Sequence, residues 1–201
     1  MKQLIIAVCL CLVAGTTGCY AKVSKTAKKE AKKRSKEGWV ASLGALPLEN
    51  QLDRSYQMQY ELDGNGSPKY YFGEAMSIGQ SYDAAKMQAQ QLALLNLAGS
   101  IQDEVTSIVQ NSLANEQLSP NEANSIVKTI TEAKTLISQK IGRSQAVVEA
   151  YRDVINGNKE VLVRLAYNSD MAKAVAKEVL RERLSKEGDE LRKKLDQIMG
   201  W

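Results

Sequence analysis

Residues 70–79, YYFGEAMSIG, and the alanine-rich stretch that follows them decide the fold of this chain. Bulky apolar side chains alternate with small ones, which predicts a strand over 69–79 with one bulky and one small face. Ser81 can cap the next helix. Apolar residues at 3.6-residue spacing then predict a helix over about 82–116, and alanine lines its first half. Alanine allows such a helix to approach a sheet closely.

Two further signals follow this helix. Ser119-Pro120-Asn121-Glu122 is a capping box with proline at the first helical position, and it predicts a second helix over about 119–138. Two alternating segments, 144–155 and 159–167, are then joined by Asn156-Gly157, which predicts a β-hairpin. In its second strand, four residues are expected to share one face: Val161, Val163, Leu165 and Tyr167.

The flanking segments read as helices. A helix is expected from Pro47 until the loop at 64–68, within a helical lead and loop over 39–68. An amphipathic helix over 169–201, interrupted near Gly188, follows the 69–168 module. It is suited either to a coiled coil or to folding back over the sheet or over the 47–62 helix.

The predicted fold class is therefore α+β. We expect a small antiparallel sheet, built in the order strand, helix, helix, strand, strand. A long helix packs on it, and additional helices lie at the N- and C-terminal ends.

The first nineteen residues indicate export. Leu4 to Ala14 are eleven apolar residues, too few to span a bilayer but typical of a signal peptide. Small residues then lead to Cys19, as at a bacterial lipoprotein processing site, which predicts a signal peptide over 1–18 and lipidation of Cys19. Thr16 stands where such sites usually carry an aliphatic residue, so cleavage after Ala21 is the alternative.

The amino-acid composition limits which catalytic and metal-binding sites the chain can form. The chain has no histidine, which excludes Ser-His-Asp and Cys-His catalysis and removes the commonest zinc ligand. Cys9 and Cys11 lie within the predicted signal peptide, and lipidation would consume Cys19, so we expect no disulfide, metal or cofactor in the folded body. An enzyme would have to use carboxylates, lysines or tyrosines alone, and we expect none.

Positive charge is concentrated in one tract. Residues 22–37 hold eight positive and two negative side chains, whereas the chain after residue 37 holds 18 and 21. We expect a lipid-anchored basic tether over 19–38, either a frayed helix or a flexible segment, because the tract has no large apolar residues to bury it. Its functional alternative is contact with anionic lipid phosphates. It lacks the interleaved aromatic residues typical of nucleic-acid binding, and no nucleic-acid partner is expected.

Three features together resemble a known family. They are Gly73-Glu74-Ala75 leaving a strand, the alanine-spaced helix from Ala84 to Ala98, and the closing strand Glu160 to Leu165. They are similar to the strand-helix-strand-strand module of small bacterial outer-membrane lipoproteins, which also forms the amino-terminal domain of flagellar assembly T protein. The resemblance covers about 69–168 and implies a membrane-anchored, non-enzymatic module used in assembly. It implies no catalytic residues, and Gly73 and Glu74 are interpreted as structural.

The sequence thus supports two functional hypotheses. The first is an exported lipoprotein with a structural or adaptor role in the cell envelope, at the outer membrane and facing the periplasm or the surface. Its partners would be the membrane, through the lipid, and an envelope protein or a second copy, through the C-terminal helix. The second is a periplasmic or surface module that binds a ligand or glycan through tyrosines at the sheet edge. Its candidates are Tyr56, Tyr60, Tyr70, Tyr71, Tyr82, Tyr151 and Tyr167.

Overall fold

The computed structural model describes residues 22–142, 144–184 and 188–200. The predicted signal peptide and Cys19 therefore lie outside the described residues. The elements follow in the order α1 Lys25–Lys36, β1 Val40–Ala41, α2 Leu48–Gln59, β2 Tyr70–Gly79, α3 Tyr82–Ala114, α4 Pro120–Lys140, β3 Gln145–Asp153, the 3-10 turn Ile155–Gly157, β4 Lys159–Asn168, α5 Ser169–Leu184 and α6 Asp189–Ile198. This order confirms the predicted α+β class.

The four strands form one antiparallel sheet in the order β1-β3-β4-β2. β2 pairs with β4 along its whole length, from Tyr70 opposite Asn168 to Gly79 opposite Lys159. The strand predicted over 69–79 is thus confirmed as one edge of the sheet. β1 forms the other edge by pairing with β3. It was not predicted, because two residues are too few to show an alternating pattern.

The hairpin between β3 and β4 is confirmed at the predicted position. Asn156 and Gly157 both have positive φ, 66° and 75°, the conformation that favours an Asn-Gly pair. The connection is longer than a two-residue turn, because the last paired residues are Asp153 and Lys159. Within it, the Val154 N–H donates to the Asn158 carbonyl at 3.0 Å.

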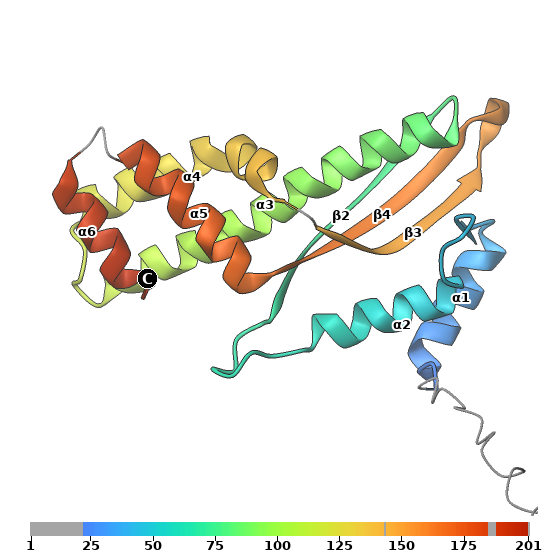
Figure 1. Ribbon diagram of the computed structural model, residues 1–201, viewed down its shortest axis with the longest axis horizontal. Helices are drawn as coiled ribbons and strands as arrows, with labels where there is room; N and C mark the ends of the chain where they lie inside the picture. The colour runs from blue at the N-terminus through green and yellow to red at the C-terminus, as the bar shows by residue number, and fades with distance from the viewer. Residues whose placement is uncertain (1–21, 143, 185–187, 201) are drawn as a thin grey trace, which may run out of the picture.

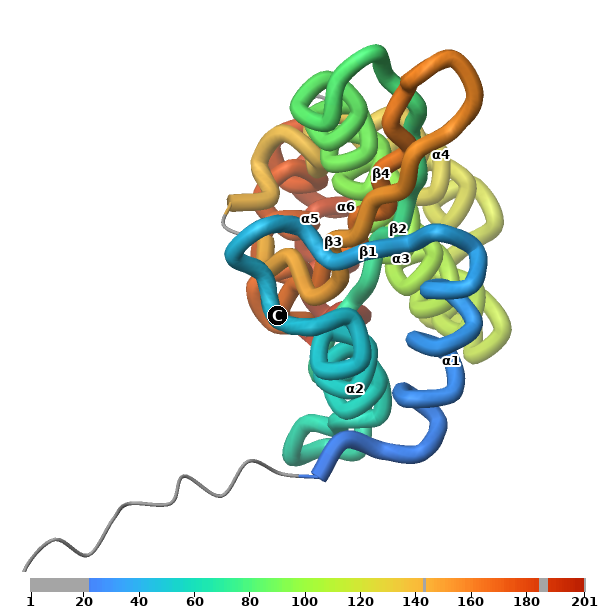
Figure 2. The backbone as a smooth tube through the Cα atoms, turned by 90° about the vertical axis from the view of Figure 1, so that its right-hand side faces the viewer, coloured from blue at the N-terminus to red at the C-terminus, as the bar shows by residue number. Residues whose placement is uncertain are grey.

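The sheet is the middle one of three layers (Figures 1 and 2). α3 covers one face, and α2 with α1 beside it covers the other. The alternation of β4 explains this arrangement: Val161, Val163 and Leu165 pack against the alanines of α3, as predicted. On the opposite face, Leu162 packs in a core cluster with Leu52 of α2. Each strand face therefore has its own helical partner.

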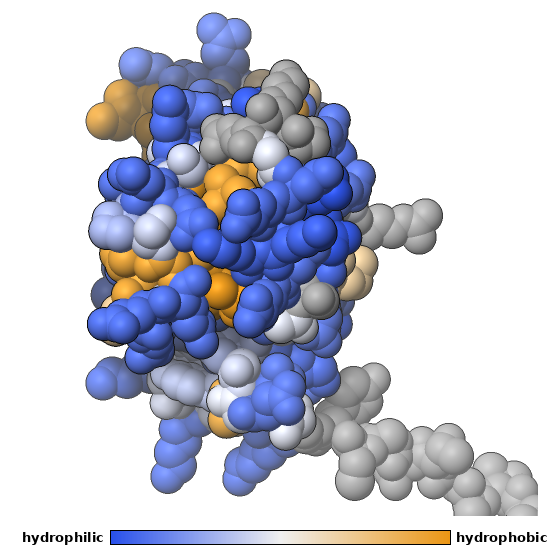
Figure 3. All heavy atoms as spheres, turned by 90° about the vertical axis from the view of Figure 1, so that its left-hand side faces the viewer, coloured by the Kyte–Doolittle hydropathy of each residue, from blue (hydrophilic) through white to orange (hydrophobic). Residues whose placement is uncertain are grey.

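Beyond the sheet, the second half of α3 packs with α4, α5 and α6 (Figure 1). The largest side chains of this helical end are fully buried, among them Ile101, Ile130, Leu180 and Leu195. Figure 3 looks onto this end, where apolar side chains show between charged ones. The C-terminal stripe packs chiefly against α4, with smaller contacts to α3 and to the strands β2 and β4. The stripe thus folds back mainly over α4 and in part over the sheet.

The expectation that nothing buries the basic tract, so that it is a frayed helix or a flexible tether, is wrong. Lys25–Lys36 form the regular helix α1, which packs against α2. Ala27 is 0% and Ala31 8% exposed. Two alanines four residues apart make a narrow stripe that buries little area but permits close contact between helices. The prediction failed because it counted only large apolar residues as able to bury a helix.

Candidate functional site

The N-terminal end of α1 is attached to α2 through a carboxylate. The backbone N–H of Ser24 donates to Asp53 Oδ1 at 2.9 Å, and Gln57 Nε2 donates to Oδ2 at 2.7 Å. The hydroxyl of Ser24 also caps the helix by accepting from the Ala27 N–H at 3.2 Å. Hydrogen bonds from the Ser24 side chain and backbone lower the pKa of Asp53, although burial opposes them. α1 is therefore fixed in place from its first turn.

The opposite side of α1 presents only cations. Four lysines recur at spacings of four, three and four residues and share the face opposite Ala27 and Ala31. We call this set the lysine face: Lys25, Lys29, Lys32 and Lys36. Lys28 and Lys33 flank it, and all six side chains are exposed. In the part of the chain that the structure describes, none of the six is paired with a carboxylate.

Two open hollows lie along α1, on either side of the lysine face. One, of about 410 Å³, lies towards the start of α2 and is lined by Lys28, Ala31, Lys32, Ser35, Leu48 and Glu49. The other, of about 480 Å³, is lined by Thr26, Lys29, Glu30, Lys32, Lys33, Lys36 and Tyr56. Ammonium groups at the rim of an open hollow can bind phosphate or carboxylate oxygens as point charges. The lysine face is the strongest candidate for a binding surface.

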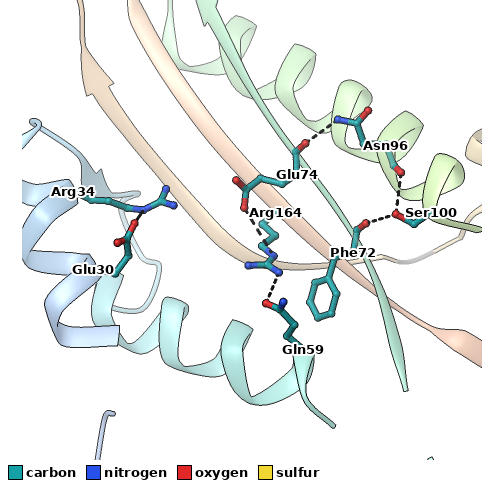
Figure 4. A network of polar contacts seen from close by, with 8 residues as sticks. All are labelled: Glu30, Arg34, Gln59, Phe72, Glu74, Asn96, Ser100 and Arg164. Atoms are coloured by element: carbon teal, nitrogen blue, oxygen red, sulfur yellow. Dashed lines mark hydrogen bonds and ion pairs between the residues drawn. The ribbon is translucent and has the colours of Figure 1, made fainter. Parts of the chain in front are cut away.

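Figure 4 shows an ion pair within α1 and, across from it, polar contacts that join the sheet to α2 and α3. Arg34 pairs with Glu30 at 2.9 Å within α1. Across from them on β4, Arg164 donates to Gln59 Oε1 at 2.9 Å and lies 3.9 Å from the Glu74 carboxylate. Its guanidinium also stacks over Phe72, 4.7 Å from the ring centroid. Among the described residues, both arginines are therefore already partnered, unlike the lysines of the lysine face.

The same view shows how α3 covers part of the outer edge of β2 (Figure 4). Asn96 Nδ2 donates to the Glu74 carbonyl at 2.8 Å, and the Ser100 hydroxyl donates to the Phe72 carbonyl at 3.0 Å. These two carbonyls would otherwise be open to another strand. The structural interpretation of Glu74 agrees with this geometry, since its side chain pairs with Arg164 and its backbone with α3.

A second polar cluster joins β3 to the start of α3. Tyr82 donates its hydroxyl proton to the Glu149 carboxylate and lies 2.8 Å from Ser42 Oγ, whose hydroxyl can donate to it, and Lys86 Nζ lies 2.8 Å from the same Glu149 oxygen. Burial disfavours the charged form of Glu149, but hydrogen bonds from Lys86 and Tyr82 outweigh it and lower its pKa. Burial and the bond to Glu149 raise the pKa of Tyr82. Tyr82 and Lys86 thus stay protonated and bonded to Glu149, an arrangement that fastens elements together.

The candidate tyrosines do not gather around one opening. Tyr82 and Tyr151 form an edge-to-face pair with centroids 5.3 Å apart. Tyr71 lies against the core of the helical end, where burial raises the pKa of its hydroxyl, and Tyr167 is buried in the same core. Tyr60 is 76% exposed beyond the end of α2. Tyr56 alone of these seven lines one of the two hollows along α1, and Tyr70 packs with Phe72 on the α2 side.

The described residues were also compared with the requirements of a metal centre and of a membrane span. Among the described residues, no three His, Cys, Asp or Glu side chains converge so that they could hold a metal ion. Every helix within these ranges is too short or too polar to cross a bilayer.

The packing of α1 and the polar contacts of Arg164 and Glu149 join residues far apart in the chain. Sequence reasoning missed them because local patterns do not encode such pairs.

Comparison with models of protein families, with curated proteins and with solved structures finds no significant match. The resemblance to small outer-membrane lipoproteins therefore rests on Gly73-Glu74-Ala75, the alanine-spaced helix and the closing strand alone.

Proposed function

We propose that this chain is an exported lipoprotein with a structural or adaptor role in the cell envelope, anchored at the outer membrane through Cys19. One observation carries the proposal. An eleven-residue apolar segment and a run of small residues lead to Cys19, and an ordered, lysine-faced helix begins only six residues later. A lipid on Cys19 would hold that helix beside the membrane. The body beyond it is folded and can present its other surfaces to a partner.

A non-enzymatic role is supported by how the ionisable groups are used. Glu149 with Lys86, and Arg181 with Asp196, pair across elements and join parts of the fold. The two hollows along α1 are open, and lysines are the commonest residues of their linings, without a general base partnered to a nucleophile. Such groups hold an architecture together and bind charged surfaces.

An adaptor needs a surface that can bind a partner. The apolar stripe of α5 is occupied, because Ala172, Ala176 and Leu180 pack in the core with α3 and α4. A coiled coil through that stripe would require α5 to leave its own core. An envelope partner is therefore more reasonably sought on exposed surfaces, by crosslinking from α6.

The test is metabolic labelling with a clickable palmitate analogue, followed by membrane fractionation. Cells would express the full chain, the Cys19→Ala variant and the matched control Cys11→Ala. We expect label and membrane retention in the wild type and in the control, and the loss of both in Cys19→Ala. An unlabelled wild type that stays soluble would contradict the proposal. It would favour cleavage after Ala21 and a free periplasmic or secreted protein.

A further inference from the structure

We infer that the lysine face of α1 binds the phosphate-bearing headgroups of an anionic membrane surface and so orients the folded body on the membrane. The inference rests on the proposed function for the position of the anchor. It goes beyond that function by assigning a binding surface, a ligand chemistry and an orientation. The surface is formed by Lys25, Lys29, Lys32 and Lys36, with Lys28 and Lys33 at its flanks.

The first argument is charge. α1 carries seven positive side chains and one carboxylate, Glu30, and that carboxylate is paired with Arg34 inside the helix. The six exposed lysines are left without a carboxylate partner among the described residues. By contrast, the chain after residue 37 holds 18 positive and 21 negative side chains. The net excess of positive charge is therefore concentrated on α1, which makes attraction to an anionic surface directional.

The second argument is rigidity. Ala27 and Ala31 are buried against α2, and Asp53 holds the backbone N–H of Ser24. A flexible tether would present its charges in all directions and lose conformational entropy on binding. Because α1 is already helical and docked, its lysines point the same way before any contact is made. The hollows at both flanks give phosphate groups room beside the lysine side chains.

The third argument is distance. Lys25 follows Cys19 by six residues, so a fully extended chain places the start of α1 at most about 22 Å from the lipid-bearing sulfur. That short link keeps the lysine face at a high effective concentration near the headgroups. α1 lies at the end of the molecule opposite α4, α5 and α6 (Figure 1). Binding through the lysine face would hold this helical end away from the bilayer.

The test measures the lysine face without the lipid. A chain beginning at Lys22 contains all the helices, strands and core clusters described, and its fold would be verified by circular dichroism and thermal melting. This chain would be sedimented with vesicles of equal parts phosphatidylglycerol and phosphatidylcholine, and with vesicles of phosphatidylcholine alone. The variant replaces the four lysines of the face by glutamine, which has nearly the same helix propensity as lysine. Circular dichroism and thermal melting would verify that it folds.

A matched control removes the same charge from the helical end. It replaces four positive side chains of α4, α5 and α6 by glutamine: Lys128, Lys173, Arg183 and Lys193. At about 50 mM salt we expect at least tenfold tighter binding to the anionic vesicles, fading as salt rises. The lysine-face variant should lose at least about tenfold in affinity, and the control no more than about twofold.

Several outcomes would overturn the inference. Equal binding to neutral vesicles, or an equal loss in the control, would show that the lysine face is not the determinant. Displacement from vesicles by inorganic phosphate at constant ionic strength would assign the surface to free phosphate. Tighter binding to a single-stranded oligonucleotide than to anionic vesicles would assign it to nucleic acid.

The lipid label separates this inference from the proposed function. A labelled protein whose lysine face does not bind vesicles would contradict this inference but support the proposed lipoprotein. Vesicle binding by the lysine face of a protein that is never labelled would support this inference but contradict the lipid anchor.

Discussion

Gly73 of β2 lies so close to α3 that a Cβ atom on it would be 2.1 Å from the carbonyl oxygen of Ala93 and 2.5 Å from the backbone nitrogen of Leu97. No other glycine described brings a Cβ so near to backbone atoms. Gly79 repeats the relationship at the other end of the strand, where its Cβ would be 2.7 Å from the Ala85 nitrogen. The contact between β2 and α3 is thus one of backbone against backbone.

Gly73→Ala should therefore destabilise the fold strongly. The added methyl meets backbone atoms, which cannot rotate away, so β2 and α3 must separate along their length. We expect a loss of about 3 kcal/mol or more in the free energy of unfolding, measured by urea denaturation. Gly64→Ala is the matched control, because a Cβ there meets nothing within 4 Å. Equal stability of the two variants would mean that α3 does not pack this tightly.

Asp53 links stability to pH through α1. Its lowered pKa means that the charged carboxylate is favoured by folding. This contribution is complete above the ordinary value of 3.8 and is lost as pH falls through the lower, folded-state value. Asp53→Asn should cost about 1 kcal/mol at neutral pH, and the difference from wild type should shrink at low pH. Urea denaturation at several pH values tests this, with the exposed Asp103→Asn as control; a constant difference would contradict it.

The cluster of Tyr82, Lys86 and Glu149 should behave as one unit. Tyr82→Phe removes a donor to Glu149, and Glu149→Gln removes the charge that both partners share. We expect each change to cost about 1 kcal/mol and their effects to be non-additive by at least about 0.5 kcal/mol. A double-mutant cycle by thermal or urea denaturation measures this coupling. Strict additivity would show that the two side chains act independently.

Sequence patterns predicted the parts of this fold that are local. The alternation of β2, the Asn156-Gly157 turn and the Ser119–Glu122 capping box each lie within one element or one connection, and the structure confirms all three. For the lysine face, the sequence predicted the positive charge but not the rigid position of α1. Its charge was evident, but its rigidity depends on Asp53, which is 29 residues from its partner Ser24. A contact of that range leaves no mark in the local periodicity of either segment.

The edge of β2 offers the last prediction. The side chains of Asn96 and Ser100 of α3 donate hydrogen bonds to the backbone carbonyls of Glu74 and Phe72, which point away from β4. An edge strand of ten residues with such groups open is a template for pairing with another chain. Asn96→Ala combined with Ser100→Ala should leave the fold intact but expose two acceptors, so that the protein self-associates with rising concentration. Size-exclusion chromatography with light scattering would detect the shift in mass.

The matched control changes the same residue types on exposed positions further along α3, Ser107→Ala with Asn111→Ala. We expect it to elute like the wild type at every concentration. Mass shifts of equal size in both variants would point to a general loss of α3 surface polarity and would contradict edge protection. A double variant that stays at wild-type mass would show that the remaining contacts of α3 suffice to shield the strand. At Gly73 the backbone of β2 lies directly against the backbone of α3. An unchanged mass of the Asn96→Ala, Ser100→Ala variant would therefore mean that α3 itself prevents a further strand from pairing with β2.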